Sequence, residues 1–223
     1  MFTGKDVFNL LEEEGIKYLH HANTSSTALS FLENGAILSR QYVEDNAETC
    51  WQTIQGTDEL DKQLGIFNDV FFDVENLWEC GPHMNNYGPV VFKFSTKVLK
   101  GRVIGIMKDN PIRGGEGGLY FERLGEVKNA CIYMNSWQFS NHIVVKDAGG
   151  SIDLASLKRV IFYSPNEPLA LDSRNNPSDA CCLIKQKSLE MGIKFENRFV
   201  DTNCIPEKKY PTFYGFMMKV PKL

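Results

Sequence analysis

Apolar and polar positions recur with two different periods in the N-terminal part of the chain. Helical spacing of apolar side chains over residues 5–14 and 24–34 predicts two helices. Residues 24–26 provide an N-cap for the second helix, and Asn34 and Gly35 end it. The segment "IKYLHHA" between the helices predicts a strand, and "AILSR" continues in extended conformation after Gly35. This region therefore predicts helix, strand, helix and strand in that order.

The middle of the chain contains short runs of β-branched and aromatic residues, which are typical of strands. They follow a polar, acidic segment at residues 41–64, which predicts a loop with a short helix. The glycine-rich stretch at residues 110–126 lacks the spacing of a phosphate-binding loop and predicts either a lid or a long surface turn. A short helix is expected at residues 154–158. The predicted strands are "DVFFDV", "YGPVVFKFS", "GRVIGIMKDN", "HIVVKD" and residues 160–163.

The C-terminal part predicts one more helix at residues 179–192 and one more strand at residues 193–200. The sequence contains no internal repeat and no linker long enough to divide it. We therefore expect a single domain over residues 1–223, with a core at about 18–165 and a C-terminal extension at 166–223 packed on it. Many short strands with few helices place the chain in the α+β class.

Composition narrows the possible partners. The formal net charge of the 223 residues is -4, so a nucleic-acid partner would have to meet a local cluster of Lys and Arg. No apolar run approaches the ~20 residues of a membrane span, and the N-terminus lacks the build of a signal peptide. We expect a cytoplasmic protein without a membrane partner.

The cysteines predict neither a disulfide scaffold nor a metal site. Six cysteines are too sparse for a scaffold in a chain of 223 residues, so reduced thiols are expected. Cys80 and His83 in "CGPH" have the spacing of metal ligands, but no second pair follows. A turn at Gly81 and Pro82 explains this motif better, and no metal is expected.

His20 and His21 stand side by side on a predicted strand, so their side chains point to opposite faces. One is expected to face a pocket, and the other to pack. The following "ANTSST" adds amides and hydroxyls at a helix N-terminus, which suits a ligand with carbonyls, hydroxyls and phosphates. Helix capping accounts for one of these hydroxyls. The alternative for either histidine is a purely structural role.

His142 follows Asn141 at the start of an apolar strand, where such a pair can bind a ribose or move a proton. The alternative is a surface histidine beside a turn. Of the nearby cations, Arg40 lies against a short predicted strand and Tyr42, and is therefore placed to reach a pocket. Lys62 is expected on the solvated surface.

Four blocks of residues carry a family resemblance: "LHHANTSSTALSFLENGAILSR", "ELDKQLGIFNDVFFDVENL", "NNYGPVVFKF" and "FSNHIVV". In this order they resemble bacterial proteins related to the DarT toxins, which use NAD to ADP-ribosylate nucleic acid. The likeness covers residues 18–165. It implies an ADP-ribosyltransferase-like fold with split antiparallel or mixed sheets and few helices. It also implies NAD as co-substrate.

The resemblance assigns roles to individual residues. It implies that His21 holds the nicotinamide ribose side of NAD, and that Phe71 or Phe72 stacks on the nicotinamide ring. His142 stands where the superfamily usually has its catalytic glutamate. Together with the residues chosen from their positions, the predicted NAD-binding residues are His21, Asn23, Thr24, Tyr42, Phe71 and Phe72, and the predicted catalytic residues are Arg40, Asn141 and His142.

The histidine at the glutamate position changes the chemistry. Breaking the bond from nicotinamide to ribose passes through an oxocarbenium-like state, which a carboxylate stabilises and a neutral imidazole does not. Glu116, Glu122 or Asp73 could supply the charge instead. Otherwise catalysis rests on orientation with general base action by His142, or the protein only binds.

The expected acceptor is a base in single-stranded RNA or DNA, because a duplex hides its reactive groups. As a toxin or anti-phage effector, the protein would be restrained by an antitoxin or chaperone protein. One alternative is an inactive module that binds NAD, ADP-ribose or another nucleotide. A thiol hydrolase using Cys131 with His142 is weaker, since Cys131 lacks a nucleophile motif. Residues that could contact a nucleic acid are Trp51, Tyr120, Phe121, Trp137, Lys100, Arg102, Lys108, Arg113 and Arg123.

Overall fold

A computed structural model of the chain describes residues 1–53, 56–80, 87–108, 119–132, 142–166, 176–201 and 203. The strands are β1 (Phe2–Thr3), β2 (Tyr18–Asn23), β3 (Ala36–Leu38), β4 (Val70–Asp73), β5 (Val90–Ser95), β6 (Val103–Ile106), β7 (His142–Val145), β8 (Ser151–Asp153), β9 (Leu157–Pro165) and β10 (Lys194–Val200). The helices are α1 (Gly4–Glu13), α2 (Ser25–Asn34), α3 (Arg40–Asp45), α4 (Asp58–Gln63), α5 (Leu77–Cys80), α6 (Leu124–Ile132) and α7 (Pro177–Glu190), with two 3-10 turns, η2 (Thr96–Leu99) and η4 (Leu154–Ser156).

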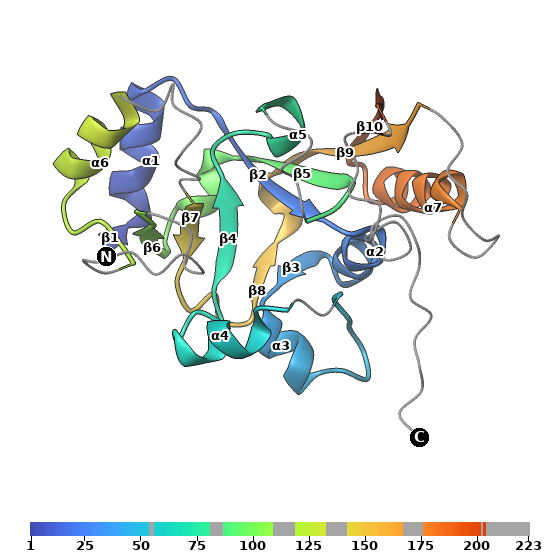
Figure 1. Cartoon of the computed structure of the whole chain (residues 1–223), viewed down its shortest axis with the longest axis horizontal. Helices are drawn as coiled ribbons and strands as arrows, with labels where there is room; N and C mark the ends of the chain where they lie inside the picture. Colours follow the sequence, from blue (N-terminus) through green and yellow to red (C-terminus); the bar gives the residue numbers. More distant parts are fainter. Residues whose placement is uncertain are drawn as a thin grey trace.

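One large sheet organises the described part of the chain (Figure 1). Its eight strands run in the order β1-β6-β7-β4-β2-β5-β9-β10, while β3 and β8 form a separate pair. β9 and β10 are parallel, and the other neighbours in the large sheet are antiparallel. α1 and α6 lie at the β1 end and α7 at the β10 end, with α4 below β4 and α3 next to α4 (Figure 1). The predicted α+β class with a mixed sheet and few helices is confirmed.

Local signals account for α2, which follows the central strand β2. Thr24 is the N-cap, and its hydroxyl accepts a hydrogen bond from the Thr27 N–H. Gly35 ends the helix in the left-handed conformation, with φ of +65°. Phe31 and Leu32 bury the inner face of the helix against the sheet. The sequence prediction of α2 and both its ends is confirmed.

Four local predictions need correction. The helix expected at 154–158 is the short turn η4, and β9 already begins at Leu157 because that residue pairs with Phe94 of β5. Arg40 begins α3 and does not continue the preceding strand. Residues 41–64 contain most of α3 and all of α4, where one short helix was expected. Helix α6 starts at Leu124, inside the segment predicted as a glycine-rich loop.

The C-terminal part adds an eighth strand to the large sheet. Asn176 caps α7, and Pro177 occupies its first turn, where the missing N–H costs nothing. β10 then pairs in parallel with β9 from Lys194 to Val200. The predicted helix and strand of this region are confirmed. None of the helices in the described ranges is long and apolar enough to span a membrane.

Candidate active site

Three ionisable side chains lie in one row across the middle of the large sheet. Asp73 of β4 is directly opposite His142 of β7 on one side and His20 of β2 on the other. Residues directly opposite each other in antiparallel strands point to the same face of a sheet. His142, Asp73 and His20 therefore share one face on three neighbouring strands.

His142 and Asp73 form the closest contact in this row. The Nδ1 atom of His142 lies 2.8 Å from Oδ1 of Asp73, and the two side chains are 9% and 14% exposed. The contact becomes an ion pair when His142 is protonated. Burial alone would lower the pKa of His142, but the Asp73 carboxylate outweighs it and raises that pKa above 6.5. The pair can therefore hold or release a proton near neutral pH.

His20 lies on the other side of Asp73 and differs from His142 in its electrostatics. Burial, together with the charge of Lys93 on β5, lowers the pKa of His20. Within the described ranges, its Nδ1 atom is buried without a hydrogen-bond partner. The row thus joins a histidine that favours its neutral form to one that favours its protonated form.

The two phenylalanines of β4 point to opposite faces of the sheet. Phe71 lies edge-on to His142, with ring centroids 6.2 Å apart and an interplanar angle of 86°. Phe72 is fully buried on the other face, where its ring contacts Phe94 and His21. Of the two predicted stacking residues, Phe71 is the one that shares a face with His142.

His21 points away from the row, as expected for the neighbour of His20 on a strand. Its Nδ1 donates a hydrogen bond of 2.7 Å to the Phe71 carbonyl, and its ring stacks on Phe31 at 6.0 Å. Burial lowers the pKa of His21. The structure therefore places His20 on the same face of the sheet as His142, with Asp73 between them. His21 lies on the other face, between Phe31 and Phe72.

The hydroxyls after β2 satisfy one another through Thr53, a residue to which the sequence drew no attention. Oγ1 of Thr53 lies 2.6 Å from Oγ1 of Thr24 and 3.2 Å from Oγ of Ser26, and the Thr53 N–H donates to Thr27. Asn23 is buried, and its side chain donates to the His21 carbonyl. Most of the hydrogen-bonding capacity of this stretch is thus used inside the protein.

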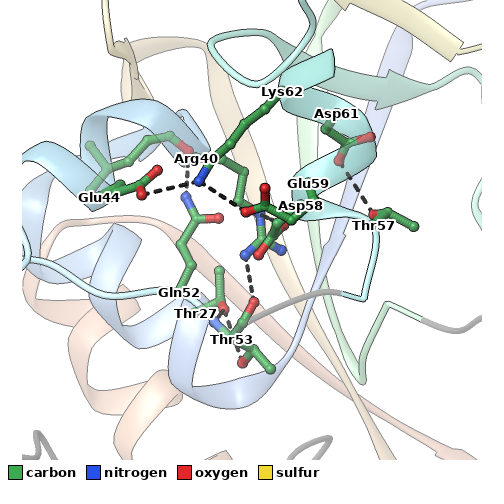
Figure 2. Close-up of polar contacts among 11 residues, drawn as sticks. Thr27, Arg40, Glu44, Gln52, Thr53, Thr57, Asp58, Glu59, Asp61 and Lys62 are labelled. Carbon is green, nitrogen blue, oxygen red and sulfur yellow. Dashed lines mark hydrogen bonds and ion pairs between the residues drawn. The ribbon is translucent and has the colours of Figure 1, made fainter. Parts of the chain in front are cut away.

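Arg40 joins the Thr53 segment to α4 (Figure 2). Its Nη1 donates to the Thr53 carbonyl at 2.5 Å, and its Nε lies 3.7 Å from Oδ1 of Asp58. Burial lowers the pKa of Arg40, against the opposing effect of Asp58 and Asp61. Lys62 instead extends over the surface to Glu44 and Glu59 (Figure 2), as predicted.

Other predicted residues lie apart from the row or outside the described ranges. Tyr42 is 37% exposed and packs against Gly150. Glu122 is exposed. No group of three His, Cys, Asp or Glu side chains with the arrangement of a metal site occurs among the described residues. The predicted residues outside the described ranges are Asn141, Glu116, Trp137, Arg113 and His83.

Comparison by sequence finds no matching family model and no similar curated protein. Comparison by structure finds that the chain shares its fold with solved DarT proteins. DarT of Thermus sp. 2.9 in complex with ADP-ribosylated ssDNA has a TM-score of 0.53 and 10% identity, covering 86% of this chain and 97% of that one. The same protein in complex with NAD+ has a TM-score of 0.50 and 10% identity, covering 82% and 96%.

DarTG of Thermosipho africanus in complex with ADP-ribose is similar over part of its length. Its TM-score is 0.53 at 12% identity, and the match covers 81% of this chain and 50% of that one. At these identities the likeness is one of fold. The chain has the DarT fold, and the resemblance noted in the sequence is confirmed at that level.

Proposed function

We propose that this chain is an NAD-dependent ADP-ribosyltransferase that modifies a base in single-stranded nucleic acid, with DNA as the preferred polymer. The observation that carries the proposal is the His142–Asp73 pair in a sheet of the DarT fold. His142 is the first residue of β7, and Asp73 is the last residue of β4. The DarT structures that share this fold were solved with NAD+ and with ADP-ribosylated ssDNA.

The residues on the His142 face suit the chemistry of such a transfer. Loss of nicotinamide leaves positive charge on the ribose, and Asp73 is the carboxylate in the row. The Phe71 ring, edge-on to His142, offers an apolar surface for a flat nicotinamide ring. His142 and His20 supply imidazole nitrogens that can bind ribose hydroxyls or accept a proton.

The cation in the proposed NAD site is Arg40. Burial is the main cause of the lowered pKa of His21, and the positive charge of Arg40 adds to it. A guanidinium binds phosphate oxygens through two parallel hydrogen bonds. In this proposal Arg40 anchors the pyrophosphate of NAD at the end of β2, next to Thr53 and Thr24. His21 and Asn23 lie on the face of the sheet opposite His142 and support this end of β2 from within the protein. Asn141 and Tyr42 remain predicted contacts.

A toxin role under the control of an antitoxin is part of the proposal. Transfer of ADP-ribose to DNA bases would block templating, so a cell that makes the enzyme needs a restraining partner. The match to half of the Thermosipho DarTG chain supports the search for such a partner. Co-expression with neighbouring genes, scored by survival of the host, would identify it.

The second candidate is a binding module of the same fold that does not catalyse transfer. The observation that favours it is the imidazole of His142, which carries no negative charge of its own. A binding module would be stabilised against heat by NAD or ADP-ribose, and would release no nicotinamide.

One experiment separates the two functions. The purified protein is incubated with NAD labelled in the adenine, in separate tubes with single-stranded DNA, single-stranded RNA and bulk protein. Label on DNA, absent from the His142→Ala variant, is the expected result. Label on RNA or protein would change the substrate class. Intact NAD in every tube, with a folded protein that NAD stabilises, would establish the binding module.

A further inference from the structure

We propose that Asp73 replaces the missing catalytic glutamate from the neighbouring strand, acting through His142 as its charge partner. This inference rests on the proposed function and names the residue that supplies the negative charge. Asp73 is thereby a positioning residue, and His142 is the group that meets the acceptor.

The register of β4 and β7 places the Asp73 carboxylate next to position 142. A glutamate at position 142 would extend from the first residue of β7, and Asp73 is the residue directly opposite on β4. The Cα atoms of such a pair lie about 4.5–5.5 Å apart, with both side chains on one face. Asp73 fills this space with its oxygen 2.8 Å from Nδ1 of His142. The Asp73 carboxylate therefore lies one strand away from position 142, on the same face of the sheet.

The pair can reproduce the charge of a glutamate. When His142 is neutral and Asp73 is ionised, the two side chains together carry a single negative charge, which in this proposal faces the ribose of NAD. The carboxylate also stabilises the imidazolium that forms when His142 takes up a proton. A lone histidine would offer neither effect.

In the transfer step, ADP-ribose moves from nicotinamide to a nitrogen of the acceptor base. The bond between C1′ of the ribose and the nicotinamide nitrogen breaks, and its electron pair leaves with nicotinamide. A nitrogen of the acceptor base donates its electron pair to C1′ and forms the new bond. The acceptor loses one proton, which passes to Nε2 of His142 and then to solvent. The products are the ADP-ribosylated base, nicotinamide and a proton.

The groups around the pair are consistent with this role. β4 contributes Asp73 and Phe71, and β6 is followed by the apolar Met107, whose N–H binds the His142 carbonyl. His20 lies on the other side of Asp73, where the charge of Lys93 lowers its pKa and that of Glu79 raises it. Burial is the main cause that raises the pKa of Tyr87 to about 12, and the negative charge of Asp73 adds to it. Within the described chain, Asp73 is the carboxylate in contact with His142.

The test compares Asp73→Asn, His142→Glu and the double variant with the wild type. Asp73→Asn is expected to reduce the transfer rate about 100-fold, the usual worth of an assisted general base. It should also move the acidic limb of the pH–rate profile to lower pH, because His142 loses the carboxylate that raises its pKa. The double variant, which returns a glutamate to position 142, is expected to recover about tenfold over Asp73→Asn.

Glu75→Gln is the matched control, since it removes an exposed acid two positions from Asp73. Its rate should equal that of the wild type. The inference is overturned if Asp73→Asn keeps wild-type activity, or if its acidic limb does not move. It is also overturned if a folded double variant is no faster than Asp73→Asn. Absence of transfer and of nicotinamide release by the wild type would instead refute the proposed function.

Discussion

The backbone of Gly88 lies directly against the backbone of Asn23, where β2 ends. A Cβ placed on Gly88 would come within 2.0 Å of the Asn23 carbonyl oxygen, and the residue has φ of +143°. The Trp78 indole N–H donates to the Gly88 carbonyl at 3.0 Å, which holds the segment in this position. Gly88→Ala should therefore lower the free energy of unfolding by about 2–4 kcal/mol, through backbone displacement and strain. Urea denaturation measures the loss.

Gly56→Ala is the matched control for this prediction. A Cβ at Gly56 meets no atom of the described residues within 4 Å, and the φ of Gly56 is not in the left-handed region. Its midpoint should stay at or above that of the wild type, because alanine restricts the unfolded chain. Equal losses in both variants would show that the contact with Asn23 is not the cause.

The sequence predicted those elements whose signals are local. Helix α2 is determined by the cap at Thr24 and the turn at Gly35. Strands β4 and β5 are determined by their short runs of β-branched and aromatic residues. β1 and β8 contain only two and three residues, too few for any period to show. The helix expected at 154–158 failed because a short apolar run fits both periods until its partner strand is known.

The candidate site depended on information that the sequence carries only indirectly. His142 and Asp73 were both recognised as candidates, but their contact follows from the register of β4 and β7, which are far apart in the chain. The opposite orientation of His20 and His21 was predictable from strand geometry. Which of them shares the face of His142 again required the register. Thr53 gave no local signal at all, because its role is to complete hydrogen bonds with α2.

Thr53→Val should destabilise the protein by about 1–3 kcal/mol, since valine keeps the shape and leaves the Thr24 and Ser26 hydroxyls short of a partner. The Thr53 backbone bonds to Thr27 and Arg40 remain, so the loss reports the hydroxyl. Chemical denaturation measures the change. Thr49→Val serves as control, because its hydroxyl donates only to an exposed turn. A difference of less than a few tenths of a kcal/mol between the two variants would contradict the prediction.

Acidification from about pH 7.5 to about pH 5.5 should reduce stability through His20 and His21. Both have a pKa lowered below 6.5 by burial, so the unfolded chain binds protons more readily than the folded one as the pH falls. Their contribution is complete above 6.5 and is lost below it. His142 has a raised pKa and acts with the opposite sign.

Variants assign this pH dependence to individual histidines. His21→Gln should flatten the decline in unfolding free energy on acidification, and His142→Gln should steepen it, because the gain from its protonation disappears. Denaturation curves at three pH values for each variant provide the measurement. The same slope in both variants and in the wild type would show that neither histidine is linked to folding.

Arg40→Gln should destabilise the protein by about 1–3 kcal/mol, because the variant loses the bond to the Thr53 carbonyl and the guanidinium beside Asp58. The Arg40 and Asp58 side chains are each 19% exposed, so their interaction is only partly screened by solvent. A double-mutant cycle with Asp58→Asn should give a favourable coupling energy between the two residues.

The surface ion pairs of Lys62, next to Arg40, provide the control for this double-mutant cycle. Lys62 contacts Glu44 and Glu59 on the solvent-exposed surface. Because exposed ion pairs contribute little to stability, Lys62→Gln should leave the unfolding midpoint unchanged. Arg40→Gln should in addition weaken the stabilisation of the protein by NAD, if the guanidinium anchors the pyrophosphate. Asp58→Asn should preserve that stabilisation, since it leaves the guanidinium in place. Equal NAD stabilisation in the wild type and in folded Arg40→Gln would limit Arg40 to its structural role between Thr53 and α4.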